Sequence, residues 1–189
     1  MQKVIILLAV LFTGKLLQAQ NLEEGKNALY YGKFTTAKNT LSNIVASKPK
    51  DAEATYWLGQ TYLRMDDIQA AKDVYQKALQ RGLNDPILLV GMGHVEMLEG
   101  EKDQAMQRFE QAINNSKTRK GENPEILNAV GRANADGPST VGNPQYAIEK
   151  LKRAAQLNPN NPDIYINLGI NYLKLGKRSK RLSGCVNGS

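Results

Sequence analysis

Apolar side chains between residues 20 and 176 recur every three or four positions, which is the spacing of the buried face of an amphipathic helix. Each such stretch covers roughly 12–15 residues, and short polar segments at residues 31–33, 65–67 and 99–101 separate successive stretches. Two helices joined by so short a turn pack as an antiparallel hairpin. The pattern therefore predicts a series of helical hairpins.

The predicted hairpins repeat every 34 residues, which is the spacing between Gly25, Gly59 and Gly93. Gly131 continues the series after an insertion at residues 116–123. Each glycine is followed, on the second helix, by an alanine, a large residue and a further small or apolar residue. These sets are Ala37, Leu41 and Ile44; Ala71, Tyr75 and Ala78; Ala105, Phe109 and Ala112; and Ala147, Leu151 and Ala154. The small residues let the two helices approach, and the large ones fill the gap between them. Because one hairpin cannot bury its apolar face alone, neighbouring hairpins must stack.

The sequence of these hairpins resembles the tetratricopeptide repeat. The segments YWLGQTY at residues 56–62 and YINLGINY at residues 165–172 carry the resemblance, together with the alanine and large-residue sets given above. The chain departs from the family pattern at Glu96 and Ala133, where the family prefers tyrosine. The resemblance covers about residues 20–176 and implies an all-α fold, an αα-hairpin superhelix of about four and a half repeats.

The chain divides into a predicted export signal, a repeat array and a basic tail. The predicted bounds are residues 1–19, 20–176 and 177–189. Within the array, repeats are expected at about residues 18–51, 52–85, 86–123 and 124–161, followed by an incomplete fifth repeat at 162–176.

The first nineteen residues have the three-part pattern of a secretory signal. A positive charge at Lys3 precedes an apolar run over residues 4–14, and Ala19 is a small residue of the kind at which signal peptidase cuts. The run is shorter than the roughly 20 residues that a membrane-spanning helix needs. We expect a mature chain that begins near Gln20, has no stable membrane insertion and lies in the periplasm or envelope of a bacterium. An uncleaved signal that anchors the chain is the alternative.

The tail at residues 177–189 lacks the apolar stripe of a second helix, so we expect it to be disordered. The repeat register calls for an alanine near residue 181 and an apolar residue near 185, where Arg181 and Cys185 stand. Two interpretations remain open. The chain is a piece of a longer protein that is truncated after Gly176, or the tail is a genuine basic extension.

The formal net charge of +7 comes from the two ends of the chain. The basic residues concerned are Lys3, Lys15, Lys174, Lys177, Arg178, Lys180 and Arg181. Without them the body carries no net charge. A nucleic-acid-binding domain is expected to have a basic face on its folded body, so the charge pattern argues against a nucleic-acid partner.

We find no catalytic, cofactor-binding or metal-binding constellation in the sequence. The chain has one histidine, His94, and one cysteine, Cys185, which are far apart and form neither a disulfide nor a metal-ligand pattern. His94 is expected to be partly exposed and without a special role. The tyrosines and Trp57 fall at core positions, where packing is their expected role. We therefore predict no catalytic residue, no cofactor and no metal.

In tetratricopeptide proteins the first helices of the repeats line a concave groove, so the resemblance implies where a partner binds. By register, the candidate groove residues are Lys26, Leu29 and Tyr30; Tyr56, Gln60, Leu63 and Arg64; Val90, His94 and Met97; and Asn128 and Arg132. Their mix of apolar and polar groups suits an amphipathic segment.

The sequence thus predicts a non-catalytic protein–protein interaction scaffold of the cell envelope, which binds a partner peptide or helix in its groove. The alternative is an N-terminal fragment of a larger multi-domain envelope protein, whose activity lies in the missing C-terminal part. An enzyme is the third class, and the missing catalytic constellation argues against it. The identity of the partner and the oligomeric state stay open.

Overall fold

The computed structural model describes residues 21–119, 121–138 and 140–186. The predicted export signal at residues 1–19 lies outside this range. The regular elements of the described part are α-helices, so the predicted all-α fold is confirmed. Within these residues, no helix combines the length and the hydrophobicity that crossing a membrane requires.

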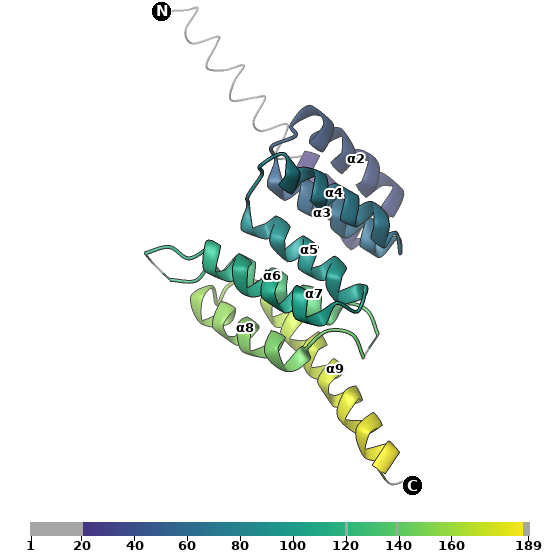
Figure 1. The fold of residues 1–189 in the computed structure, drawn as a ribbon, viewed down its shortest axis with the longest axis vertical. Coiled ribbons are helices and arrows are strands. Elements are labelled where there is room, and N and C mark those ends of the chain that lie inside the picture. Colours follow the sequence, from purple (N-terminus) through teal and green to yellow (C-terminus); the bar gives the residue numbers. More distant parts are fainter. Residues whose placement is uncertain (1–20, 120, 139, 187–189) are drawn as a thin grey trace, which may run out of the picture. The chain divides into compact units, whose positions relative to one another are not determined.

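The chain folds as two compact units, one up to Leu83 and one from Asn84 onwards, which we name the N-terminal lobe and the C-terminal lobe (Figure 1). The N-terminal lobe contains a helix over residues 21–30 and helices α2 (Phe34–Ser47), α3 (Ala52–Arg64) and α4 (Ile68–Gln80). The C-terminal lobe contains α5 (Pro86–Leu98), α6 (Lys102–Asn115), α7 (Pro124–Ala135), α8 (Pro144–Leu157) and α9 (Pro162–Val186).

Local sequence signals start and separate these helices. The Asp51 carboxylate accepts a hydrogen bond from the Ala54 N–H at the start of α3, and Asp67 caps α4 through the Ala70 N–H. Proline occupies the first turn of α5, α7 and α8, where its missing N–H costs no helical hydrogen bond. The turn inside the first hairpin places Gly32 in the left-handed region, with a φ of 71°.

The closest packing within each hairpin occurs where the glycine of the first helix meets the large residue of the second. A Cβ atom added to Gly25 would lie 2.8 Å from Leu41 Cγ, and one added to Gly93 would lie 2.7 Å from Phe109 Cε1. The two other pairs of this kind are Gly59 with Tyr75 and Gly131 with Leu151. All four large residues are fully buried, which is the close approach that the repeat pattern predicts.

In the C-terminal lobe, α5, α7 and α9 pack side by side in that order, while α6 packs on α5 and α8 packs on α7 and α9 (Figure 1). The first helices of the hairpins, α5, α7 and α9, therefore form one layer, and the second helices, α6 and α8, form the other. This is the stacked hairpin arrangement of a helical superhelix.

Helix α9 does not end near Gly176, where the sequence predicted the start of a disordered tail. It continues to Val186 as one helix of 25 residues. The segment contains no proline, and its Lys, Arg and Leu residues are good helix formers, so the helix loses only about 1 kcal/mol at Gly176 relative to alanine. Residues 187–189 lie outside the described range.

Candidate partner-binding surface

Asparagine side chains join α9 to α7 in the layer of first helices. The Asn167 amide donates to the Asn128 side-chain oxygen at 2.9 Å, and the Asn171 amide donates to the Gly131 carbonyl at 3.0 Å. The three asparagines are buried. Because buried amides stabilise a fold only when they are bonded, these contacts favour one arrangement of the two helices.

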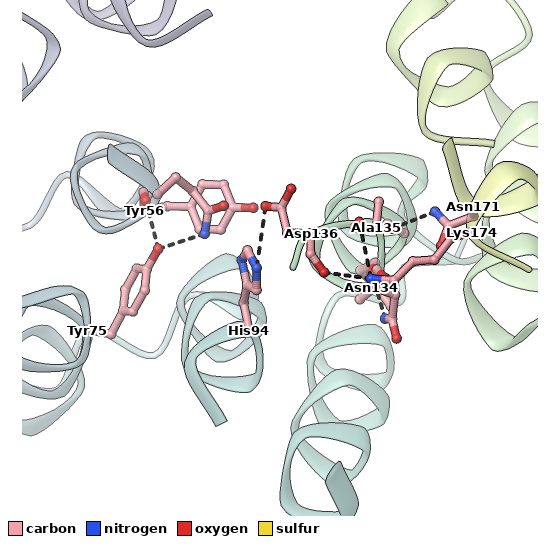
Figure 2. A network of polar contacts seen from close by, with 11 residues as sticks. Tyr56, Tyr75, His94, Asn134, Ala135, Asp136, Asn171 and Lys174 are labelled. Atoms are coloured by element: carbon pink, nitrogen blue, oxygen red, sulfur yellow. Dashed lines mark hydrogen bonds and ion pairs between the residues drawn. The ribbon is translucent and has the colours of Figure 1, made fainter. Parts of the chain in front are cut away.

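Lys174 adds a charged contact at the C-terminal end of α7 (Figure 2). Its ammonium donates to the carbonyl oxygens of Asn134, Ala135 and Asp136 at 2.9, 3.2 and 2.6 Å. A cation at this end of a helix satisfies carbonyls that lack intrahelical partners and interacts favourably with the helix dipole. Burial lowers the pKa of Lys174 to about 8, with a nearby Arg178 acting in the same direction and Asp136 opposing. The ammonium therefore stays protonated at pH 7.

His94 lies in the interior of the C-terminal lobe, beside the end of α7. Its Nε2 atom is 3.4 Å from the Asp136 carboxylate, and neither ring nitrogen has a hydrogen-bond partner among the described residues (Figure 2). Burial lowers the pKa of His94 to about 4, Arg132 and Lys174 lower it further, and Asp136 opposes them. The expectation of a partly exposed histidine is wrong, because the packed side chains leave His94 only 1% exposed. It is neutral at pH 7.

Two of the residues expected to face a partner from α3 instead take part in the packing of α3 on α4. The Tyr75 hydroxyl donates to the Tyr56 carbonyl at 2.9 Å and accepts from the Gln60 amide at 3.0 Å (Figure 2). Tyr56 and Gln60 are buried. The interior therefore includes two residues whose register in the repeat suggested a binding role.

Lys26 connects the helix over residues 21–30 with α3. Its ammonium lies 2.6 Å from the Glu23 carboxylate, 3.3 Å from that of Glu53, and 5.6 Å from the centre of the Trp57 ring. Lys26 is half-buried, and these contacts hold its side chain along the surface of the lobe.

The twelve candidate groove residues differ widely in exposure. Those buried are Tyr56, Gln60, Leu63, Val90, His94, Met97 and Asn128. Those half-buried are Lys26, Leu29 and Arg132, and those exposed are Tyr30 and Arg64. A partner-binding role for the set stays a prediction. In this conformation, only the half-buried and exposed members can touch a partner.

Several tyrosines that were expected in the core lie at the surface. Tyr30 is 77% exposed and Tyr31 is 72% exposed, and their rings stack edge to face at 5.1 Å. Tyr165 and Tyr172 of α9 are about half exposed. Tyr56 and Tyr75 pack in the core as expected. The expected core position is wrong for the four exposed tyrosines.

The contacts of Asn167, Asn171 and Lys174 were missed in the sequence. Their signal was available, because they follow one another by four and three residues and so form a polar stripe along one face of α9. A polar stripe on an otherwise apolar helix usually indicates a solvated face, and here it faces α7 instead.

The part of the chain that the structure describes contains no group of three His, Cys, Asp or Glu residues placed to hold a metal ion. A shallow surface hollow in the N-terminal lobe is lined by residues 48–51, and it does not include any candidate groove residue.

Stacked antiparallel hairpins with a glycine packed against a large residue define a helical-repeat scaffold. The chain belongs to the tetratricopeptide repeat family. Family models described as tetratricopeptide repeat and TPR repeat match residues 22–86 and 143–176. Repeats of this family mediate protein–protein interactions, so the fold is that of an interaction scaffold.

Two curated relatives are similar over part of their length. The mouse protein BBSome complex member BBS4 is 27% identical over 114 residues, which are 60% of this chain and 21% of that protein. Tetratricopeptide repeat protein 8 of Caenorhabditis elegans is 24% identical over 142 residues, which are 75% of this chain and 26% of that protein. The chain thus spans about a fifth to a quarter of the length of these relatives.

Two solved structures share the fold. A thermophilic TPR protein of Thermus thermophilus has a TM-score of 0.58 at 20% identity, and the match covers 81% of this chain and 80% of that one. The pilF protein of Pseudomonas aeruginosa has a TM-score of 0.52 at 20% identity, covering 85% of this chain and 69% of that one. At this identity the likeness shows the fold alone.

Proposed function

We propose that this protein is an exported scaffold that binds an amphipathic segment of a partner protein. The accessible candidate residues of the N-terminal lobe, namely Lys26, Leu29, Tyr30 and Arg64, form the proposed contact surface. No step of this function requires a catalytic residue, a cofactor or a metal.

The observation that carries the proposal is the exposure of Tyr30. A tyrosine that is 77% exposed leaves a large aromatic surface in water, at a repeat position that faces the groove in this family. Tyrosines of this kind are enriched among the residues that dominate binding energy, because a rigid ring buries much area at little entropic cost. The Tyr31 ring contacts the Tyr30 ring edge to face and adds to this exposed aromatic surface.

The chemistry of the neighbouring residues indicates the kind of partner segment. Arg64 follows Tyr30 by one repeat of 34 residues, so it takes the same position on the next first helix. Leu29 adds apolar area, and Arg64 adds an exposed positive charge. A segment that presents an apolar face and an acidic residue would match both groups.

Membership of a multiprotein assembly is consistent with the relatives. The mouse relative is named as a member of the BBSome complex, and this chain covers only part of that protein. The same partial coverage supports the second candidate function, in which this array is one part of a longer envelope protein and serves to dock it.

Affinity capture tests the binding surface. We expect the purified chain to retain a defined protein after cross-linking in cells, and Tyr30→Ala and Arg64→Glu each to lower its recovery about tenfold, which corresponds to about 1.4 kcal/mol. Arg81→Glu is the matched control, because Arg81 is an exposed arginine at the end of α4, a second helix. Equal recovery with all three variants would overturn the proposed surface.

Export is tested separately, by mass spectrometry of the protein after cell fractionation. We expect a periplasmic or envelope-associated chain whose first residue is Gln20. A cytoplasmic chain that retains Met1 would contradict the export part of the proposal and leave the binding part unaffected.

A further inference from the structure

The two faces of α9 have the reverse of the usual polarity. The face packed on α7 contains Asn167, Asn171 and Lys174, with Ile164 as its buried apolar residue. The opposite face, which we name the open face, contains Tyr165, Ile166, Gly169, Ile170, Tyr172, Leu173 and Gly176. Its five large residues are 42–68% exposed, with Leu173 the most exposed. So many neighbouring apolar side chains in water indicate an interaction surface.

The repeat itself indicates that a helix covers this face. In four hairpins the motif glycine lies against a large side chain of the following helix, as Gly131 does against Leu151. Gly169 stands at the same motif position, and a Cβ atom added there would meet nothing within 4 Å. A Cβ added at Gly176, seven residues on, would also meet open space. The open face thus presents two notches at helix-packing spacing.

The open face is complementary to itself. When two copies of α9 are placed antiparallel through their open faces, with the two-fold axis at the level of residue 171, Gly169 of each copy lies opposite Leu173 of the other. In the same register Gly176 lies opposite Ile166. Each notch therefore receives a large apolar side chain, and the same pairs occur twice about a two-fold axis.

Charge favours the same pairing. Asp163 lies at the N-terminal end of α9, and Lys177 lies near the other end, on the same flank of the open face. In an antiparallel pair of helices, residues on the same flank meet across the interface. Asp163 of one copy then lies near Lys177 of the other.

We propose that the occupant of the open face is a second copy of this chain, bound through an antiparallel, two-fold symmetric pair of α9 helices. The pair supplies each Gly169 with the large side chain that the following helix supplies in the earlier hairpins. The interface is separate from the proposed partner-binding surface, which lies in the N-terminal lobe, so a dimer would present two such surfaces.

Analytical ultracentrifugation of the purified full chain over a wide concentration range tests the proposal. We expect a monomer–dimer equilibrium, and a dissociation constant at least tenfold weaker for Leu173→Glu. Tyr31→Glu is the matched control, because Tyr31 is similarly exposed but lies in the N-terminal lobe, and it should leave the equilibrium unchanged. Circular dichroism establishes that each variant is folded. A monomer at all concentrations, or a dimer that Leu173→Glu leaves intact, would overturn the proposal.

Cysteine cross-linking tests the register. In a Cys185→Ser background, a mixture of Gly169→Cys and Leu173→Cys chains should form a mixed disulfide, because these positions are opposite each other. Neither chain alone should cross-link efficiently, since in this register identical positions are several ångströms apart along the helices, beyond the roughly 7 Å Cα separation that a disulfide tolerates. Efficient cross-linking of either chain with itself, or no mixed product, would contradict this register.

Discussion

Gly93 and Gly169 stand at the same position of the repeated motif, but their surroundings differ. A Cβ atom at Gly93 would lie 2.7 Å from Phe109 Cε1 and 3.2 Å from the Ala105 carbonyl oxygen, whereas one at Gly169 would meet nothing within 4 Å. The glycine is required for packing where a second helix covers it, and it is exposed where no helix does. The motif therefore predicts the position of a residue within the repeat, and the neighbouring helix decides whether that residue is buried.

The comparison extends to whole regions of the C-terminal lobe. Helices α5 to α8 enclose apolar side chains between two layers, while α9 turns a polar stripe toward α7 and an apolar face outward. Substitutions on the covered side and on the open side should therefore have different costs.

The largest difference is expected between Leu151→Ala and Leu173→Ala. Leu151 is fully buried against Gly131, so its truncation should lower the free energy of unfolding by about 2–5 kcal/mol. Leu173 is 68% exposed, and its truncation should change the free energy by less than about 0.5 kcal/mol in the monomer. Urea denaturation at protein concentrations below self-association measures both. Similar costs for the two leucines would mean that the open face is covered within the monomer.

A second difference is expected in the pH dependence of stability, because His94 is enclosed in the covered region. Its folded pKa of about 4 lies below the ordinary 6.5, so the unfolded chain binds a proton first as the pH falls. Above about pH 6.5, His94 is neutral in both the folded and the unfolded chain and does not make the free energy of unfolding depend on pH. As the pH falls from 6.5 towards 4, protonation of the unfolded chain lowers the free energy of unfolding by up to about 3 kcal/mol.

His94 is the only histidine, so its imidazole resonance in an NMR titration reports this pKa directly. Denaturation of the wild type and of His94→Gln across the same pH range isolates its contribution to stability. A resonance that titrates near 6.5 would contradict the buried position.

The packed face of α9 is tested by Lys174→Met, which keeps the length of the side chain and removes the charge. Three carbonyl oxygens at the end of α7 lose their donor, so the free energy of unfolding should fall by about 2 kcal/mol. In the monomer, at concentrations below self-association, Lys177→Met on the exposed side of the same helix should change it by less than about 0.5 kcal/mol. Equal effects in thermal or urea denaturation would contradict the capping role.

The sequence was sufficient for the hairpins and for the contacts inside them. The glycine, alanine and large-residue sets predicted the close approach that the structure shows at Gly93 and Phe109, because those contacts join residues close in sequence and fixed in register. Short polar turns and helix-capping residues such as Asp51 and Asp67 were also predictable, because they act on residues close to them in the sequence.

The candidate groove was less predictable, because exposure depends on packing between helices. Gln60 has a polar side chain at a groove position, but its amide donates to Tyr75 and is buried. Lys174 looked like part of a basic end of the chain, and it binds the end of α7. The repeat spacing does not indicate that Gln60 bonds the Tyr75 hydroxyl, and the polar stripe of α9 does not by itself indicate that Lys174 faces α7. The continuation of α9 past Gly176 was missed because the absence of an apolar stripe was taken as absence of a helix.

The most direct test of the central claim, that the motif glycine is covered in the earlier hairpins and uncovered in α9, is a matched pair of alanine substitutions. Urea denaturation of Gly93→Ala and Gly169→Ala at concentrations below self-association measures the effect of one added methyl group at the same motif position. We expect Gly93→Ala to lower the free energy of unfolding by about 1–3 kcal/mol, because Phe109 must move. We expect Gly169→Ala to raise it by up to about 1 kcal/mol, because alanine favours the helix and nothing is displaced. Destabilisation of similar size at both positions would contradict the account.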